Sequence, residues 1–163
     1  MLFRSTARSL VKSSLTEARS SIWNLRSATA GADDLPARIN RAVTQAAANG
    51  PAKLRFQVRG TYRAAPPAVE DQLLRVSQEA VNNAVHHSGA SMIDVTLGYD
   101  TQAVELSVDD DGRGFTYDPA GFVPGGHFGL QGMQERAAEI GGVLRIDAQP
   151  AKGTRISLHV DIP

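Results

Sequence analysis

The order in which helical and strand periodicities follow one another constrains the fold of this chain most. Residues 68–87 carry an apolar stripe at helical spacing, directly after Pro66–Pro67. One strand-like segment precedes this helix, two follow it, and two more end the sequence after a shorter helix. The strict alternation of strand and helix that marks a doubly wound parallel sheet is missing. The pattern therefore predicts an α+β fold, a two-layer sandwich of helices on a mixed, mainly antiparallel sheet.

Local signals set the expected bounds of these elements. Apolar and polar side chains alternate in residues 53–59, which is typical of a half-buried strand. Glycine ends the helices at Gly50, Gly89 and Gly141. Residues 111–128 are rich in glycine and are expected to form a mobile loop. The expected helices are residues 34–49, 68–87 and 129–140, and the expected strands are residues 53–59, 91–99, 103–109, 143–149 and 154–161.

The first thirty residues contain a separate helical repeat. Its apolar positions are spaced by four and three, as in the a/d seam of a coiled coil or bundle: Val11, Leu15, Ala18, Ile22 and Leu25. One such helix cannot bury its seam alone, so we expect a partner helix or another chain; the alternative is a helix lying on its own domain. Residues 1–15, rich in Arg and Ser and free of acids, also resemble a transit peptide in composition.

Composition narrows the functional class. The chain has 17 basic and 17 acidic residues and no cysteine. A net charge of zero gives no electrostatic reason to expect nucleic acid as a partner. The lack of cysteine excludes disulfides and thiolate metal sites and fits the cytoplasm. No apolar run approaches the length of a membrane-spanning helix.

A polar face on the long helix offers ligands for a cation. Glu79, Asn83 and His87 recur every four residues, so they stack on one side, displaced from the apolar stripe. A carboxylate and an amide oxygen one turn apart suit Mg²⁺ that also keeps water and phosphate ligands. A solvated helix face is the alternative for these residues taken alone.

Asp110 directly follows the third expected strand, and Gly112 and Gly114 come after it. An ionised Asp at that position can accept a hydrogen bond from an exocyclic amino group, while glycines let the backbone approach a flat ring closely. A tight turn is the simpler alternative. A calcium loop does not fit, because the bidentate acid of an EF-hand is absent at its spacing.

Glycines also lead into the shorter helix. Gly126, His127, Gly129, Leu130 and Gly132 bring backbone N–H groups and the positive end of a helix dipole together, which suits phosphate oxygens. The stretch matches neither a Walker loop nor a dinucleotide fingerprint, and a flexible linker is the alternative. Thr154, at the start of the last strand, adds a hydroxyl able to touch a ligand.

Three strings in this order resemble the ATP-binding domain of sensor histidine kinases, part of the superfamily shared with gyrase, MutL-type proteins and the dimeric heat-shock chaperones. They are QEAVNNAVHHSGA at residues 78–90, DDGRGF at 110–115 and GHFGLQGMQERA at 126–137. The likeness is closest to the subgroup whose partners are LuxR-type response regulators. It covers residues 35–163, and the seam in residues 1–30 resembles the end of a dimerisation-bundle helix, leaving 31–163 as the catalytic domain.

The resemblance implies a role for each motif. Asn83 would bind Mg²⁺, and His87 would contact the cofactor as well. Glu79 would be the catalytic acidic residue, aiding the metal or polarising the phosphoryl acceptor. Asp110 would bind adenine, with Gly112 and Gly114 letting the backbone close on the base. Thr154 would contact the ligand from the last strand. The remaining residues would form the mobile lid and the segment on the phosphate side of the ATP site: Gly126, His127, Gly129, Leu130 and Gly132.

The acceptor histidine of such kinases lies on the first bundle helix, and that helix is not recognised here. The four histidines all fall within the expected ATP domain: His86, His87, His127 and His159. The resemblance therefore implies the C-terminal part of a longer, cytoplasmic or inner-membrane-anchored homodimer that donates the γ-phosphate to a bundle histidine for relay to a response regulator. Two alternatives stay open: a gyrase-like relative that hydrolyses ATP through Glu79, and an anti-sigma-type serine kinase or interaction module.

Overall fold

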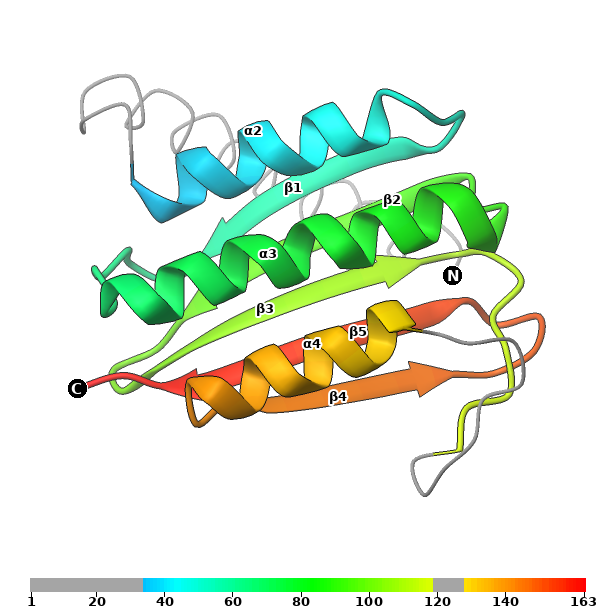
Figure 1. Ribbon diagram of the computed structural model, residues 1–163. Coiled ribbons are helices and arrows are strands. Elements are labelled where there is room, and N and C mark those ends of the chain that lie inside the picture. Colours follow the sequence, from blue (N-terminus) through cyan, green and yellow to red (C-terminus); the bar gives the residue numbers. More distant parts are fainter. Residues whose placement is uncertain (1–33, 119–127) are drawn as a thin grey trace, which may run out of the picture. The chain divides into compact units, whose positions relative to one another are not determined.

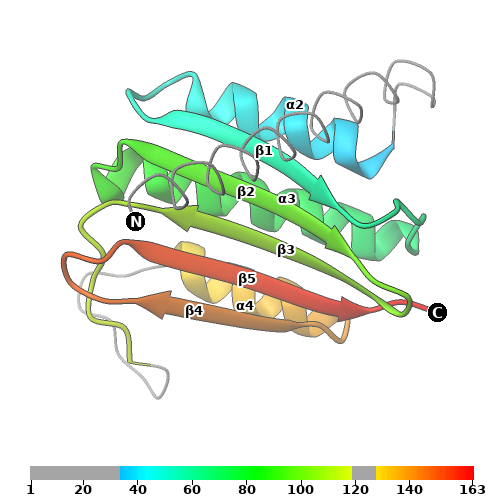
Figure 2. The same ribbon diagram turned by 180° about the vertical axis from the view of Figure 1, so that it is seen from behind.

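A five-stranded mixed sheet covered on one face by three helices forms the compact unit Leu35–Pro163. The computed structural model describes residues 34–118 and 128–163. In Figures 1 and 2 the helices lie on the same side of the sheet, with the other side uncovered by them. This confirms the predicted α+β sandwich. The predictions for residues 1–30 lie outside the described residues.

The elements fall close to their predicted positions. In chain order they are α2 (Leu35–Ala47), β1 (Lys53–Arg59), α3 (Pro67–Asn83), η1 (Ala84–Ser88), β2 (Met92–Tyr99), β3 (Ala103–Asp110), α4 (Phe128–Glu139), β4 (Val143–Ala148) and β5 (Thr154–Asp161). The predicted hairpins are both present, because β2 pairs antiparallel with β3 and β4 with β5.

The strand order is β1-β2-β3-β5-β4, so chain order and sheet order differ. β1 and β2 are parallel and α3 crosses over between them, which makes one β-α-β unit at this edge of the sheet. β5 lies between β3 and β4 and pairs antiparallel with both. This pairing sets Asp110, the last residue of β3, opposite Thr154, the first residue of β5.

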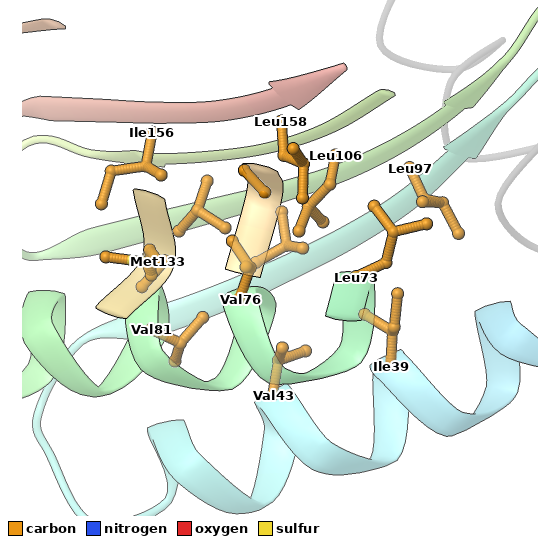
Figure 3. Close-up of a cluster of buried hydrophobic side chains, with 14 of the residues drawn as sticks. Ile39, Val43, Leu73, Val76, Val81, Leu97, Leu106, Met133, Ile156 and Leu158 are labelled. Atoms are coloured by element: carbon orange, nitrogen blue, oxygen red, sulfur yellow. The ribbon is translucent and has the colours of Figure 1, made fainter. Parts of the chain in front are cut away.

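Apolar side chains from the inner face of the sheet and from all three helices form one core (Figure 3). Alternate residues of β2 are buried, as expected for a strand with one covered face. Leu73 and Val76 of α3 are fully buried, as are Ile39 and Val43 of α2. α3 thus packs on the sheet with α2 and α4 on either side of it, and its predicted apolar stripe faces the core.

The end of α3 departs from a regular helix. The sequence predicts one helix as far as residue 87, whereas the structure changes from α to π geometry at Ala84–Ser88. Gly89 then ends the helix in the left-handed conformation, with φ of 63°. Such wide turns are frequent at functional sites, and this one carries His87 and Ser88.

The outer face of the sheet is polar. Arg55 pairs with Asp94 across β1 and β2, and Arg155 pairs with Asp109 across β5 and β3.

In the described part of the chain, no helix has the length and apolarity that crossing a membrane requires.

Candidate functional site

A cavity of about 270 Å³ opens between the end of α3, the beginning of α4 and the sheet. Its sheet side is formed at the end of β3 and the beginning of β5, by Asp110, Thr154 and Ile156. Small-molecule sites have volumes from about 300 Å³ upward, and the cavity lies just below that range. Segments far apart in the sequence therefore meet at one hollow.

Asp110 supplies a half-buried carboxyl group to this cavity. Its Oδ1 accepts a hydrogen bond from the backbone N–H of Gly112 at 2.9 Å. Burial raises the pKa of Asp110 above its usual range, and backbone N–H groups of Gly112 and Thr154 partly offset that rise. A carboxylate fixed in this way keeps acceptor capacity for a ligand's amino group.

Gly112 and Gly114 shape the loop that carries Asp110. A Cβ on Gly112 would lie 2.4 Å from the carbonyl oxygen of Ser88. Gly114 has φ of +57°, and a Cβ there would lie 2.0 Å from the carbonyl oxygen of Gln149. Both glycines let the loop pack against neighbouring backbone. Only Gly114 of the two lines the cavity.

The polar face of α3 also meets the cavity. Glu79, Asn83 and His87 all line it, as the helical spacing predicts. Glu79 and Asn83 are half-buried and His87 is exposed. Because one carboxylate and one amide make an incomplete coordination shell, this pair fits an ion that takes further oxygens from phosphate and water, as Mg²⁺ does. Among the described residues no three His, Asp or Glu side chains cluster as a metal site.

The start of α4 closes the cavity on the side of Glu79. Gly129 and Leu130 line it, and a Cβ on Gly129 would lie 2.3 Å from Glu79 Oε1 and 3.3 Å from Asn83 Nδ2. The first N–H groups of α4 therefore lie beside the two candidate metal ligands. Gly132, one turn further along, does not line the cavity, and Gly126 and His127 lie outside the described residues.

Sequence patterns did not single out several residues of the cavity wall. Ala80, Ala84 and Ile156 form apolar parts of it, together with Phe115. Phe128 lies at the rim and is 82% exposed. The only signal for Phe115 was its place next to Gly114, because apolar residues of a ligand site and of a core look alike in sequence.

Arg113 ties the Asp110 loop to the end of α3. Its backbone N–H donates to the carbonyl oxygen of Ser88 at 2.8 Å. Its side-chain Nε donates to the carbonyl oxygen of His87 at 2.6 Å. The carbonyls at a helix end have no partner within the helix, so Arg113 satisfies two of them from outside. The two sides of the cavity are thereby joined.

Residues 68–163 match the model of the family described as "Histidine kinase-, DNA gyrase B-, and HSP90-like ATPase". The chain belongs to this family. It carries the ATPase domain found in sensor histidine kinases. It is 34% identical over 146 residues to the sensor histidine kinase LiaS of Bacillus subtilis, covering 90% of this chain and 39% of LiaS. It is 36% identical over 97 residues to the sensor protein VraS of Staphylococcus epidermidis, covering 60% of this chain and 27% of VraS.

Solved histidine kinases share the fold of this ATPase domain. The kinase domain of the Erythrobacter litoralis EL346 blue-light activated histidine kinase superposes with a TM-score of 0.64 at 17% identity, over 83% of this chain and 68% of that one. The mycobacterial sensor histidine kinase MprB gives a TM-score of 0.55 at 23% identity, over 80% and 97%. The chain spans about two fifths or less of the length of LiaS and VraS.

Proposed function

We propose that this ATPase domain binds Mg–ATP in the cavity and donates the γ-phosphate to a histidine on the dimerisation bundle of its parent kinase. The observation that carries the proposal is that Asn83, Asp110 and Gly129 line one cavity, although they come from three different segments. Each supplies a different part of nucleotide recognition.

The base would lie at the sheet end of the cavity. Asp110 accepts a hydrogen bond from the amino group of adenine, which guanine does not present in the same place. Ala84, Phe115 and Ile156 provide apolar contacts for a flat ring. Thr154 contributes a hydroxyl beside Asp110, and Gly114 keeps the loop backbone close to the base.

The phosphates would lie toward α4. N–H groups at its first turn, at Gly129 and Leu130, suit phosphate oxygens, and we assign Gly126, His127 and Gly132 to the same side. Mg²⁺, when bound by Asn83 and Glu79, would neutralise phosphate charge. Glu79 would orient the acceptor imidazole and take its proton as the phosphorus–nitrogen bond forms and the bond to the ADP oxygen breaks.

For the parent protein we propose a homodimer of the two-component type. Residues 1–30 would end its dimerisation bundle and residues 31–163 would form the catalytic domain. The phosphohistidine would pass its phosphoryl group to a response regulator of the LuxR type. We place the domain in the cytoplasm, with any membrane anchor outside it.

Calorimetric titration with Mg–ATP tests the site. Asp110→Asn is expected to abolish measurable binding, because the amide presents a donor where the amino group of adenine needs an acceptor. Asn83→Asp is expected to do the same by changing the charge beside the metal and phosphates. Asp109→Asn is the matched control, since Asp109 pairs with Arg155 on the outer face of the sheet. Unchanged affinity in Asp110→Asn, or equal loss in Asp109→Asn, would remove the assignment.

A further inference from the structure

A second hollow lies along α3, on the other side of Glu79 from the cavity. α3 runs between α2 and α4 (Figure 1), and side chains of all three helices line a trough of about 410 Å³. Ala42 and Ala46 of α2 line one wall, and their small side chains leave it wide. We call this hollow the α3 trough.

The α3 trough is polar and carries unpaired positive charge. Gln78 and Asn82 of α3 and Gln45 of α2 line it with amide groups. Arg75 and Arg136 line it as well, and neither has an ion pair or hydrogen bond with any described side chain. A polypeptide with carboxylates would satisfy both guanidinium groups, which bind carboxylates in bidentate fashion.

Glu79 connects the trough to the nucleotide site. Among the described residues, Glu79 alone lines both hollows, and no other carboxylate of residues 34–118 or 128–163 lines the trough. A side chain that enters the trough beside Glu79 is therefore separated from the cavity only by Glu79 itself. The neighbouring Asn82 faces the trough, whereas Asn83 faces the cavity.

We propose that the α3 trough is the docking site for an acidic helical segment of the protein that accepts the phosphoryl group. Arg75 and Arg136 bind the carboxylates of this segment, and the amides of Gln45, Gln78 and Asn82 bind its other polar groups. The acceptor side chain then approaches the nucleotide past Glu79. This assignment rests on the proposed function, because it names the surface by which that function reaches its protein substrate.

The test uses this chain, labelled with ¹⁵N, and two synthetic helical peptides. One peptide contains Glu on both sides of a central His; the other has Gln in place of each Glu. The acidic peptide is expected to shift amide resonances of α2 and α3 at Gln45, Gln78 and Asn82. The Gln peptide is expected to bind at least about tenfold more weakly, since it lacks the charges that pair with arginine.

Charge-reversal variants locate the contact. Arg75→Glu and Arg136→Glu should each weaken the acidic peptide by about tenfold or more, because attraction becomes repulsion. Arg145→Glu is the matched control: it makes the same charge change on β4, where Arg145 is exposed and lines no part of the trough. All three variants should bind Mg–ATP within about twofold of the unchanged chain.

Three results would overturn the docking site: resonance shifts confined to other surfaces, equal binding of both peptides, or equal weakening by Arg145→Glu. A concentration-dependent shift at the trough without any peptide would assign it to a second copy of this chain instead. The nucleotide titrations report separately on the proposed function. If the unchanged chain does not bind Mg–ATP, the proposed function is refuted, whereas the peptide titrations still decide whether the trough binds an acidic helix.

Discussion

Three consecutive aspartates at the end of β3 show how far surroundings alone can separate identical side chains. Asp109 points to the outer face of the sheet and pairs with Arg155. Asp110 points inward, where burial raises its pKa. Asp111 is exposed and accepts hydrogen bonds from the N–H groups of Ser91 and Met92, which lower its pKa. Asp109 thus forms an ion pair, Asp110 lines the cavity, and Asp111 binds the backbone at the start of β2.

The raised pKa of Asp110 predicts a change of stability with pH. Without ligand, the ionised and partly buried carboxylate opposes folding at neutral pH, and protonation removes that cost as the pH falls through the raised pKa. Asp110→Asn is therefore expected to be more stable than the unchanged chain at pH about 7, with the difference shrinking toward pH about 4. Urea unfolding across this range measures it.

Asp109→Asn serves as the control because it removes an ion pair instead of a buried charge. It is expected to lower the free energy of unfolding slightly at neutral pH, by less than about 1 kcal/mol. If Asp110→Asn lowers the free energy of unfolding at neutral pH, the carboxylate stabilises the fold and lies in the cavity for a structural reason. A residue that lowers stability and is needed for binding is instead typical of a functional group.

At the scale of elements, the cavity depends on contacts between the Asp110 loop and the end of α3. The π turn at Ala84–Ser88 brings His87 and Ser88 to the loop, where Arg113 binds both carbonyl groups. The backbone carbonyl of Arg113 also accepts a hydrogen bond from the N–H of Ala151, between β4 and β5. One residue thus holds three segments at fixed spacing.

Arg113→Ala is expected to weaken Mg–ATP binding by about fivefold. The side-chain hydrogen bond to His87 orders the site, and its loss reduces the binding free energy by about 1 kcal/mol. Calorimetry gives the affinity, and circular dichroism checks that the helices persist. Arg113→Lys should recover part of the affinity, since an ammonium group also donates to helix-end carbonyls. Equal affinity in Arg113→Ala would show that the contact has no influence on the site.

Sequence periodicity sufficed for most of these elements and not for their assembly. The predicted strand ranges agree with the observed ones within one or two residues, because alternation of buried and exposed side chains, as in β2, is a local signal. The glycine after Ser88 is an equally local signal for the end of the helix. The parallel pairing of β1 with β2 is not local: alternation decides which face of β1 is buried but not which strand lies beside it. The π turn likewise leaves no mark in the apolar spacing of α3.

The site shows the same division. Glu79, Asn83, Asp110 and Thr154 were predicted from motifs, and the structure gathers them at the cavity. The place of Gly112 was not predictable, because its neighbour Ser88 becomes close only when the loop packs on α3. The trough beside Glu79 was missed as well, since its residues come from three helices and read as ordinary solvated faces.

For the whole molecule, the arrangement of histidines bears on what a chain with this sequence can do alone. His159 lies on the outer face of the sheet beside Asp161, across the sheet from the helices. His87 lines the cavity at the end of α3, beside the Asp110 loop, and not at the Glu79 end where the phosphates are assigned. Neither of these two histidines lies at the Glu79 end of the cavity, to which the phosphates are assigned.

Because the acceptor is assigned to a bundle histidine, incubation with γ-labelled ATP is expected to leave this chain without acid-labile phosphate, although it binds the nucleotide. The measurement is retention of label after denaturation, compared at acid and alkaline pH. Label that is stable to acid would instead favour a serine kinase, and steady release of inorganic phosphate would favour hydrolysis. Acid-labile label on the chain itself would contradict the assignment of the acceptor to a bundle.

The interior place of β5 has a consequence for how the protein is made. A ribosome synthesises β5 after every other strand, yet β5 separates β3 from β4 and carries Thr154 and Ile156 into the cavity. A nascent chain therefore has no complete nucleotide site until nearly all of residues 34–163 have emerged. Prematurely terminated products would expose the unpaired edge of β3 to other chains. ATP would not stabilise these products, because they lack the residues of β5 that line the cavity.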